Sequence, residues 1–449
     1  MTYDILYPYQ KTIVDKLKPF NSSALFTDTG TGKSYMSIAL YQDKLHKRLV
    51  NKCVVICLLG KIEEWERDFK KFQPFDRVLI MDGKKEALKK YHSGDWDILL
   101  INFERTWRTP DMLTYTDANT MIIIDESHKI KECKTKQGDF IGKLGMLTPY
   151  KLCLTATPMG NGYIDLYNQF YFLGFLGMSK KAFDDMFVVY KLVVIPGAKP
   201  FRKVDYYKNT KLLDDLSSKY CYFYERPIDE EMLPSELKID FKLDKNYNKI
   251  MKDRVYEDIV LDSISAKRLA LKSLCSGTLM GKTLIKDDNS DRLYQLNKDK
   301  IEWVKTYLDS FNKRVVIFYQ YTHQMEQLYD EITKMKRPCA RYNAEYKEKD
   351  KFIENEDCVI LVQYKSGGTG IDWLKNAYVG IFYSLPDSYV EFYQAKGRID
   401  RNGQTKKPLF YILVANGSNS VDAMNYKALQ EKQDFNDEYF ENCFGKDVI

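Results

Sequence analysis

The sequence has few of the residues that build metal centres and disulfide frameworks. It contains 4 histidines, and its 9 cysteines form no Cys-x-x-Cys pair, so we expect neither a zinc site nor a disulfide scaffold. Three cysteines, Cys53, Cys57 and Cys153, lie inside apolar runs, where Cys acts as a small hydrophobic residue. This usage is typical of a reducing compartment, so we expect a cytoplasmic protein.

The sequence also lacks long hydrophobic runs. No segment approaches the ~18–20 apolar residues that cross a bilayer, and the first residues lack the basic and apolar regions of a secretion signal. We therefore expect no membrane partner. An apolar content of 44% excludes wholesale disorder, and a net charge of +6 permits a nucleic-acid partner without diagnosing one. The length of 449 residues suggests two or three domains.

Short apolar runs alternate with charged, helical segments in both halves of the chain. Continuous apolar strands separated by helices are typical of parallel sheets covered on both faces, so the sequence predicts two α/β lobes. The middle, from about residue 160 to residue 300, lacks this rhythm. The predicted strands are Ser23–Thr27, Cys53–Leu59, Val78–Met81, Ile98–Asn102, Met121–Asp125, Leu152–Thr155, Val315–Tyr319, Ala340–Tyr342, Val359–Val362, Val379–Tyr383 and Leu409–Val414.

A candidate phosphate-binding loop follows the first predicted strand. Gly30, Thr31 and Gly32 form a turn, and a helix is expected to begin near Lys33. Such a loop directs backbone N–H groups at phosphate oxygens, where Lys33 would reach the β- and γ-phosphates and Ser34 would bind Mg²⁺. The usual glycine six residues before the lysine is replaced by Thr27. On this element alone, a plain tight turn before a helix is the alternative.

Two carboxylates end another predicted strand. Met121–Asp125 is apolar up to Asp125, and Glu126 follows directly. Ligands of open α/β sheets bind at the carboxyl ends of strands. There Asp125 could hold Mg²⁺ through water, and Glu126 could orient and deprotonate an attacking water. The alternative, a solvated acidic strand end, loses weight beside the Gly-Lys-Ser loop.

These elements resemble helicase superfamily 2 in its SWI/SNF-like branch. Asp125–Lys131 resembles motif II, and further motifs follow in the same order between about Leu6 and Lys432. The resembling segments are Leu6–Gln10 (Q motif), Leu59–Trp65 (Ia), Asp97–Phe103 (Ib), Leu154–Pro158 with its extension to Tyr167 (III), Val315–Tyr321 (IV), Ser366–Asp372 (V) and Gln394–Gln404 (VI).

The resemblance implies two RecA-like, doubly wound parallel-sheet lobes with an ATP cleft between them. It implies that Gln10 reads adenine and that His128, Thr155 and Thr157 couple hydrolysis to strand binding. Arg398, Arg401 and Gln404 would join Lys33 and the acidic pair as catalytic residues. An arginine finger of this kind is worth ~10³–10⁵ in rate. Surface salt-bridging is the plain alternative for the two arginines.

The implied domain boundaries are an N-terminal ATP-binding lobe over residues 1–225, a linker or brace over 226–300 and a C-terminal helicase lobe over 301–449. The segment Lys238–Lys300 looks mainly helical and carries no evident chemistry. We expect it to pack on the second lobe.

Nucleic-acid contacts are expected at motif V. Its Gly367, Gly368, Thr369 and Gly370 would let backbone N–H groups approach phosphates, although a flexible turn is the alternative. The branch favours duplex or branched DNA, bound without sequence preference. The chain has no long lobe insertions and no chromatin-reading module, which suggests a minimal, phage- or prokaryote-type enzyme acting on bare forks or junctions. Replication or recombination proteins are candidate partners, and we expect a monomer.

A predicted hairpin adds a hypothesis of our own. Two β-rich runs, Phe187–Ile195 and Phe201–Tyr207, flank a Pro-Gly turn. Residues 180–213 contain eight Lys or Arg against three Asp, a local net charge of +5. We hypothesise that Lys199, Arg202 and Lys203 contact DNA and that the hairpin separates strands. A packing insertion with a solvated basic face is the alternative.

The sequence thus predicts an ATP- and Mg²⁺-dependent DNA translocase or helicase that unwinds or remodels branched DNA. Two alternatives stay open. One is a duplex translocase that does not separate strands, such as a protein-displacing or restriction-type motor. The other is a non-catalytic nucleic-acid clamp, which the presence of Lys33, Glu126 and Arg398 disfavours.

Overall fold

The computed structural model describes residues 2–130, 135–160, 162–193, 201–225, 230–283, 291–364, 372–401 and 403–444. The chain forms two compact units. The first comprises Met1–Val193 and Phe201–Pro227, and the second is built mainly from Ile228–Ile449. Within the described ranges, no helix is long and apolar enough to span a membrane.

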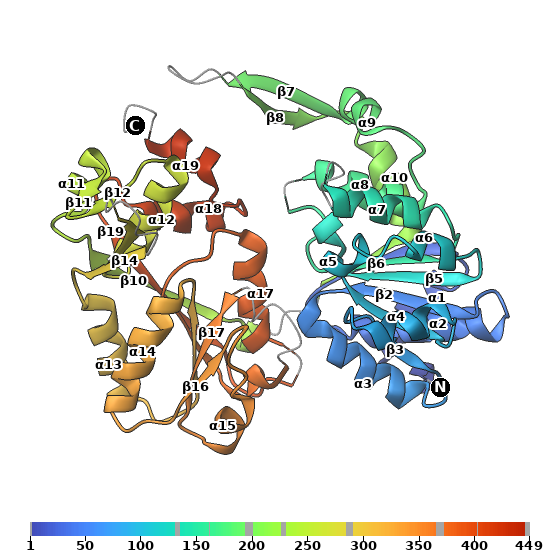
Figure 1. The fold of residues 1–449 in the computed structure, drawn as a ribbon, viewed down its shortest axis with the longest axis horizontal. Helices are drawn as coiled ribbons and strands as arrows, with labels where there is room; N and C mark the ends of the chain where they lie inside the picture. Colours follow the sequence, from blue (N-terminus) through green and yellow to red (C-terminus); the bar gives the residue numbers. More distant parts are fainter. Residues whose placement is uncertain are drawn as a thin grey trace. The chain divides into compact units, whose positions relative to one another are not determined.

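A seven-stranded parallel sheet forms the centre of the first unit (Figure 1). Its strand order is β3-β4-β2-β5-β6-β1-β9. Because both faces of the sheet are covered, the central strands are buried almost throughout. The strands are β1 (Ser22–Thr27), β2 (Lys52–Cys57), β3 (Val78–Ile80), β4 (Ile98–Asn102), β5 (Thr120–Asp125), β6 (Lys151–Thr155) and β9 (Cys221–Tyr224).

Helices cover both faces of this sheet, and the sheet separates two apolar cores. One core contains Ile13, Met36 and Trp65 and lies under the N-terminal helices; the other contains Ile141 and Phe170. The N-terminal helices are η1 (Thr2–Ile5), α1 (Pro8–Leu17), α2 (Lys33–His46), η2 (Leu59–Lys61) and α3 (Ile62–Phe72). The others are α4 (Lys85–His92), α5 (Phe103–Thr106), α6 (Met112–Tyr115), η3 (Ser127–Ile130), α7 (Lys136–Gly145), η4 (Tyr163–Asp165), α8 (Leu166–Leu173), α9 (Lys180–Phe187) and α10 (Lys211–Tyr220).

The predicted hairpin is present in the first unit. Strands β7 (Val188–Val193) and β8 (Phe201–Tyr207) pair antiparallel, with an irregularity between Val189 and Tyr190. The two strands extend away from α9 (Figure 1). Their bases join the core, since Val188 is buried and Val204 and Tyr207 pack against it.

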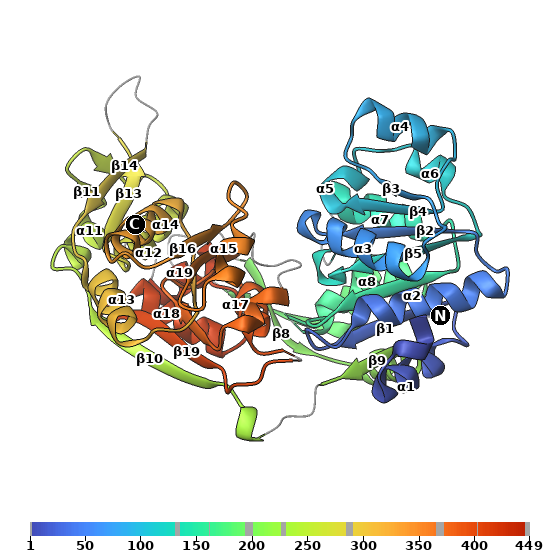
Figure 2. The same cartoon turned by 90° about the horizontal axis from the view of Figure 1, so that it is seen from below.

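The second unit has a six-stranded parallel sheet of order β10-β19-β18-β15-β17-β16 (Figure 2). Its strands are β10 (Ser235–Lys242), β15 (Val315–Tyr319), β16 (Cys339–Tyr342), β17 (Val359–Gln363), β18 (Val379–Phe382) and β19 (Leu409–Asn416). Its helices are α13 (Asp299–Ser310), α14 (Thr322–Lys334), α15 (Lys349–Glu354), η6 (Asp372–Asn376), α17 (Tyr389–Ile399), α18 (Val421–Gln430) and α19 (Asp437–Phe444). The expected α/β fold with two parallel-sheet lobes is confirmed.

The segment expected to be mainly helical needs a correction. The short helix η5 (Glu230–Met232) precedes the segment. Besides α11 (Tyr247–Asp253) and α12 (Ile264–Leu274), the segment contains most of β10 and the short pairs β11 (Val255–Tyr256) with β12 (Ile259–Val260) and β13 (Thr278–Lys282) with β14 (Asp291–Gln295). Strand β10 alternates apolar and charged residues because it lies at a sheet edge, with its residues half-buried or exposed.

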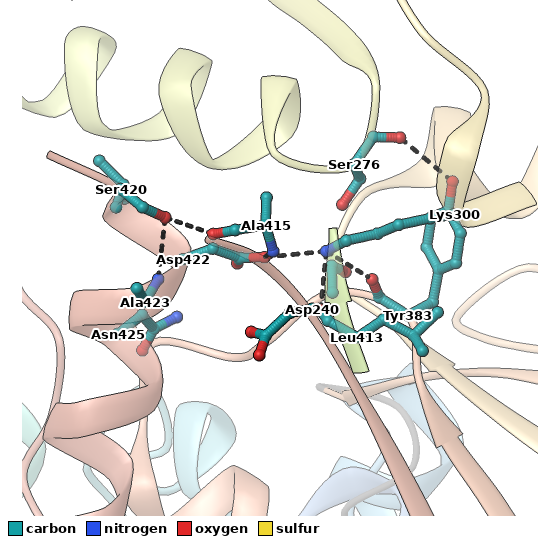
Figure 3. Close-up of polar contacts among 12 residues, drawn as sticks. Asp240, Ser276, Lys300, Tyr383, Leu413, Ala415, Ser420, Asp422, Ala423 and Asn425 are labelled. Atoms are coloured by element: carbon teal, nitrogen blue, oxygen red, sulfur yellow. Dashed lines mark hydrogen bonds and ion pairs between the residues drawn. The ribbon is translucent and has the colours of Figure 1, made fainter. Parts of the chain in front are cut away.

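The segment packs on the second lobe through a separate apolar core and buried polar contacts. Leu271 and Leu274 of α12 share this core with Ala428 and Phe435. Next to it, Lys300 at the start of α13 is buried and donates to Asp422 at 2.8 Å and to the Leu413 carbonyl at 2.8 Å (Figure 3). These contacts tie α13 to the end of the central strand β19.

Candidate nucleotide site

The phosphate-type loop lies between β1 and α2, at the carboxyl end of the first unit's sheet. Gly30 and Gly32 have φ of 75° and 81°, a region that favours glycine. A Cβ on Gly32 would also lie 2.3 Å from the side-chain nitrogen of Gln10. Both the backbone conformation and the close approach therefore require glycine at position 32. Ser34, the predicted metal ligand, follows Lys33 in the first turn of α2.

Lys33 is folded back against its own loop. Its ammonium donates to the carbonyls of Thr27 at 2.8 Å and Asp28 at 2.9 Å. Burial lowers the pKa of Lys33 to about 8, while the negative charges of Glu126 and Asp125 act in the opposite direction. The lysine is thus protonated at neutral pH and close to its titration range.

Gln10 supports this loop from beneath. Its side-chain oxygen accepts from the Tyr7 backbone N–H at 2.9 Å, and its nitrogen donates to the Thr31 carbonyl at 2.8 Å. The Tyr9 hydroxyl donates to the same carbonyl at 3.0 Å. Gln10 is 4% exposed. In this structure the Gln10 amide therefore holds the loop, and its adenine-reading role stays a prediction.

The acidic pair is buried at the end of β5. Glu126 has φ of 59°, an unusual conformation for a residue with a side chain. The indole N–H of Trp65, from α3, donates to a carboxylate oxygen of Asp125 at 3.0 Å. On the other side, His128 Nδ1 lies 3.3 Å from Glu126 Oε2. The Trp65 indole thus holds one carboxylate, and the His128 imidazole lies beside the other.

The two carboxyl groups have opposite pKa shifts. Burial and the charge of Glu126 raise the pKa of Asp125, with Lys61, Trp65 and Lys33 opposing. Burial also acts to raise the pKa of Glu126, but the hydrogen bond and charge of His128 and the charges of Lys33 and Lys61 lower it to about 2. Glu126 is therefore ionised at neutral pH and suited to orienting a water molecule.

The predicted coupling residues lie together, with His128 and Thr155 buried and Thr157 half-buried. His128 Nδ1 lies 3.0 Å from the Thr155 hydroxyl, and that hydroxyl accepts from the backbone N–H of Thr157 at 3.0 Å. The end of β5 and the end of β6 are neighbours in the sheet, so the His128–Thr155 contact joins motif II directly to motif III. The structure thus brings these three residues together, and their coupling role stays a prediction.

Gln169 of α8 is a functional candidate that the sequence interpretation missed. Its side chain is fully buried and accepts from the Ser127 hydroxyl at 2.7 Å. Its nitrogen donates to the carbonyls of Pro158 at 2.9 Å and Asp165 at 3.1 Å. A polar residue inside the apolar run Leu166–Leu173 was the available signal, because buried amides need partners.

The motif VI residues lie in the second unit. Arg398 is near the end of α17 and is 5% exposed, and Arg401 is half-buried. The Gln404 amide donates to the carbonyls of Lys375 at 3.0 Å and Ala377 at 2.8 Å, and its oxygen accepts from the Thr405 N–H at 3.0 Å. Gln404 thus shapes the turn after α17, and a catalytic contact by it stays a prediction.

The predicted nucleic-acid residues are described only in part. Gly367, Gly368, Thr369, Gly370 and Lys199 lie outside the described residues, as does the Lys203 side chain. Arg202 is exposed on β8. Lys191 pairs with Asp205 at 3.0 Å and Lys180 pairs with Asp184, so part of the hairpin's positive charge is neutralised locally.

A glycine loop with its lysine, facing two buried carboxylates on a parallel sheet, defines a nucleotide-hydrolysing unit of the P-loop class. Comparison with protein families agrees. The SNF2-related domain family matches residues 11–222, and the Helicase conserved C-terminal domain family matches residues 299–403. The chain belongs to the SNF2-like branch of helicase superfamily 2 and is an ATP-dependent enzyme of that family.

Relatives span bacteria, plants and yeast. The chain is 24% identical to the uncharacterized ATP-dependent helicase YqhH of Bacillus subtilis, over 95% of this chain and 78% of that protein. It is 24% identical to the CHD3-type chromatin-remodeling factor PICKLE of Arabidopsis thaliana, over 92% of this chain and 33% of that one. It is 23% identical to the DNA repair and recombination protein RDH54 of Saccharomyces cerevisiae, over 92% and 51%. The chain therefore spans about half or less of the last two relatives.

Among solved structures, the SWI2/SNF2 ATPase core of Sulfolobus solfataricus in complex with dsDNA is similar to this chain. The two are 21% identical over 99% of this chain and 94% of that chain, with a TM-score of 0.43.

Proposed function

We propose that this protein is an ATP- and Mg²⁺-dependent DNA motor that unwinds or remodels branched DNA such as forks and junctions. The observation that carries the proposal is the buried cluster of Glu126, His128 and Thr155, which links the water-orienting carboxylate to the loop after β6. Neighbouring groups lower the pKa of Glu126 although the carboxyl group is buried. A non-catalytic clamp would not need such an ionised carboxylate at the nucleotide site.

The residues present fit a magnesium ion. The Ser34 hydroxyl and the Asp125 carboxylate are oxygen ligands of the kind Mg²⁺ prefers, and Trp65 orients the carboxylate. No group of three or more His, Cys, Asp or Glu side chains in the described ranges is placed to hold a metal by itself. We propose that phosphate oxygens and water complete the site. When bound, Mg²⁺ would neutralise charge that develops on the phosphates.

The chain's own residues supply the other requirements of phosphoryl transfer. Lys33 would exchange its bonds to Thr27 and Asp28 for phosphate oxygens. Glu126 would orient the attacking water and accept its proton as the bond from the water oxygen to the γ-phosphorus forms, while the bond from that phosphorus to the β–γ bridging oxygen breaks and ADP leaves. Arg398 and Arg401 are proposed to stabilise the developing negative charge, as in the family motif they match.

DNA as the partner is supported by the chain's relatives and by its basic hairpin. RDH54 is a DNA repair and recombination protein, and the alignment with it covers 92% of this chain and 51% of RDH54. In the described part of the hairpin and its flanks, Lys181, Arg202, Lys208 and Lys211 are exposed. Binding through such residues is sequence-independent and falls steeply with salt.

The deciding experiment compares ATP hydrolysis with single-stranded, duplex, forked and four-way DNA and with RNA. We expect the greatest stimulation by forked and four-way DNA, together with displacement of a strand from these substrates. Duplex stimulation with triplex displacement but no strand separation would instead identify the duplex translocase. Glu126→Gln is the matched control, expected to bind ATP and DNA without turnover. Wild-type protein that binds DNA but hydrolyses no ATP would identify a clamp and refute the proposal.

A further inference from the structure

The base of the β7–β8 hairpin is seated on the loop that follows motif III. Tyr207, the last residue of β8, lies over Gly162, where a Cβ would be 2.6 Å from the Tyr207 hydroxyl oxygen. Gly162 also has φ of 90°, which residues with side chains rarely adopt. Position 162 therefore accommodates this tyrosine only as glycine, both for space and for backbone conformation.

Further contacts fix the hairpin base to the same loop. The backbone N–H of Ile164 donates to the Tyr207 hydroxyl, although burial raises the pKa of that tyrosine. The rings of Tyr163 and Tyr207 meet edge to face, with centroids 5.4 Å apart. The Tyr163 hydroxyl donates to Asp214 of α10 at 2.7 Å. The short helix η4 is thus held by both the strand and the helix that follow the hairpin turn.

The same loop is held to the nucleotide site at its other end. The Gln169 amide nitrogen donates hydrogen bonds to the carbonyls of Pro158 and Asp165, which lie on either side of Gly162 in the sequence. Its oxygen accepts a hydrogen bond from the Ser127 hydroxyl. Ser127 directly follows Glu126 in the chain. A continuous set of contacts therefore runs from Glu126 to Tyr207 through packed and hydrogen-bonded groups, and such a network can carry energetic coupling between two sites.

Beyond its base, the hairpin leaves the body of the unit. Leu192 is 63% exposed and Tyr206 is 58% exposed, and the Lys191–Asp205 pair is on the surface. The two strands pair along their length, so they move as one piece. Tyr207 and Tyr206 are neighbours on the same strand, but only Tyr207 contacts the loop after motif III within the described residues.

We propose that Tyr207, seated on Gly162, is a positioning residue that transmits changes at the nucleotide site to the β7–β8 hairpin. The inference rests on the proposed function in one respect, since it gives the hairpin a mechanical role in the DNA motor. A shift of the loop after motif III would tilt the hairpin, because Gly162 and Ile164 hold the tyrosine at its base. The part of β7 and β8 that lies beyond the hairpin base would then move with each hydrolysis cycle.

Hydrogen exchange tests this coupling without DNA. The full chain is measured with and without a non-hydrolysable ATP analogue and Mg²⁺, following peptides from the β7 and β8 strands. In the wild type we expect the analogue to change exchange in these peptides. Tyr207→Ala and Tyr207→Leu should abolish that change, and Tyr207→Phe, which keeps the ring on Gly162, should retain most of it. Tyr206→Ala is the control on the same strand and should respond like the wild type.

A second measurement separates coupling from strand separation. Strand displacement per ATP hydrolysed should fall at least about fivefold in Tyr207→Ala, while Tyr207→Phe stays close to wild type and both variants retain basal hydrolysis. An unchanged nucleotide response of the hairpin in Tyr207→Ala and Tyr207→Leu overturns the inference, as does a wild-type hairpin that ignores the nucleotide. Loss of the response in these variants, with no strand displacement by the wild type, would uphold the coupling and refute only the proposed unwinding function.

Discussion

The indole N–H of Trp65 donates a 3.0 Å hydrogen bond to the Asp125 carboxylate, across 60 residues of sequence. Trp65 is fully buried in α3 and packs beside Phe69, so its ring has a fixed position. The bond opposes the burial that raises the pKa of Asp125. Trp65 therefore helps to keep the proposed metal ligand ionised and correctly oriented.

Replacing Trp65 by Phe should weaken magnesium binding. Without the N–H donor, the pKa of Asp125 rises further, and the carboxylate is both less ionised and less well oriented. Partners of this kind are worth about 10–100-fold in metal affinity, so we expect the Mg²⁺ concentration for half-maximal ATP hydrolysis to rise at least tenfold. Trp96→Phe is a matched control, because Trp96 is also buried but bonds the Tyr91 carbonyl at 3.3 Å. An unchanged Mg²⁺ requirement in Trp65→Phe would contradict this role.

Nucleotide binding should weaken at alkaline pH. Lys33 binds phosphate as the ammonium ion, and its pKa in the free protein is about 8. The protonated form is present below this value and is lost as the pH rises through it. We expect the dissociation constant of an ATP analogue to be nearly constant from pH 6 to pH 7 and to rise about tenfold per pH unit well above pH 8.

Lys33→Arg provides the comparison for this pH dependence. Arginine stays protonated throughout the range, so its affinity for the analogue should be lower but flat with pH. Titration followed by fluorescence of a labelled nucleotide measures both proteins under the same conditions. A wild-type affinity that is equally flat up to pH 10 would show that Lys33 does not govern the profile.

The sequence was sufficient to predict the central strands. It also predicted that the Lys33 loop follows β1 and that Asp125 ends β5. Val54 to Cys57 and Ile122 to Ile124 are continuous apolar runs, which are typical of a sheet covered on both faces. Strands β9 and β10 were missed for local reasons: β9 is short and directly follows α10, and β10 alternates polar and apolar residues. In β10 this alternation replaces the continuous apolar pattern of the buried strands.

The contacts of Trp65, Gln169 and Tyr207 could not be predicted for a different reason. Each depends on a partner that is distant in sequence, such as Asp125 for Trp65 and Gly162 for Tyr207. Apolar periodicity identifies a buried face but not which donor meets which acceptor. Only the three-dimensional register of β5, β6 and α8 brings these groups together.

Removing the Gln169 amide should slow turnover without weakening nucleotide binding. In Gln169→Leu, the Ser127 hydroxyl and the carbonyls of Pro158 and Asp165 lose a buried partner, at a cost of about 1–3 kcal/mol in stability. The loop after β6 would lose its link to Glu126. Because small misplacements of catalytic groups cost up to about 10²-fold, we expect kcat to fall roughly 10–100-fold with KM for ATP little changed.

Gln137→Leu is the control for this variant. Gln137 is in α7, and its side chain makes an exposed 3.3 Å contact with the Lys129 carbonyl. It should leave both kinetic constants near wild type. If Gln169→Leu raised KM in proportion to the loss of kcat/KM and left kcat intact, Gln169 would act in substrate binding instead of positioning.

Breaking the buried Lys300–Asp422 pair should destabilise the second unit strongly. The two side chains are 3% and 2% exposed, and the Asp422 oxygen that binds Lys300 also accepts from the Ala415 backbone N–H at 3.0 Å (Figure 3). Replacing one partner leaves the other charge buried without compensation, so Asp422→Leu should lower the free energy of unfolding by about 3–5 kcal/mol. The double variant Lys300→Met, Asp422→Leu should lose less stability than the sum of the losses in the two single variants.

Urea unfolding measures each variant, with Lys238→Met as the control. The surface pair of Lys238 with Asp240 at 2.8 Å should be worth at most about 1 kcal/mol. Additive losses in the double variant would mean that the two charges do not stabilise one another.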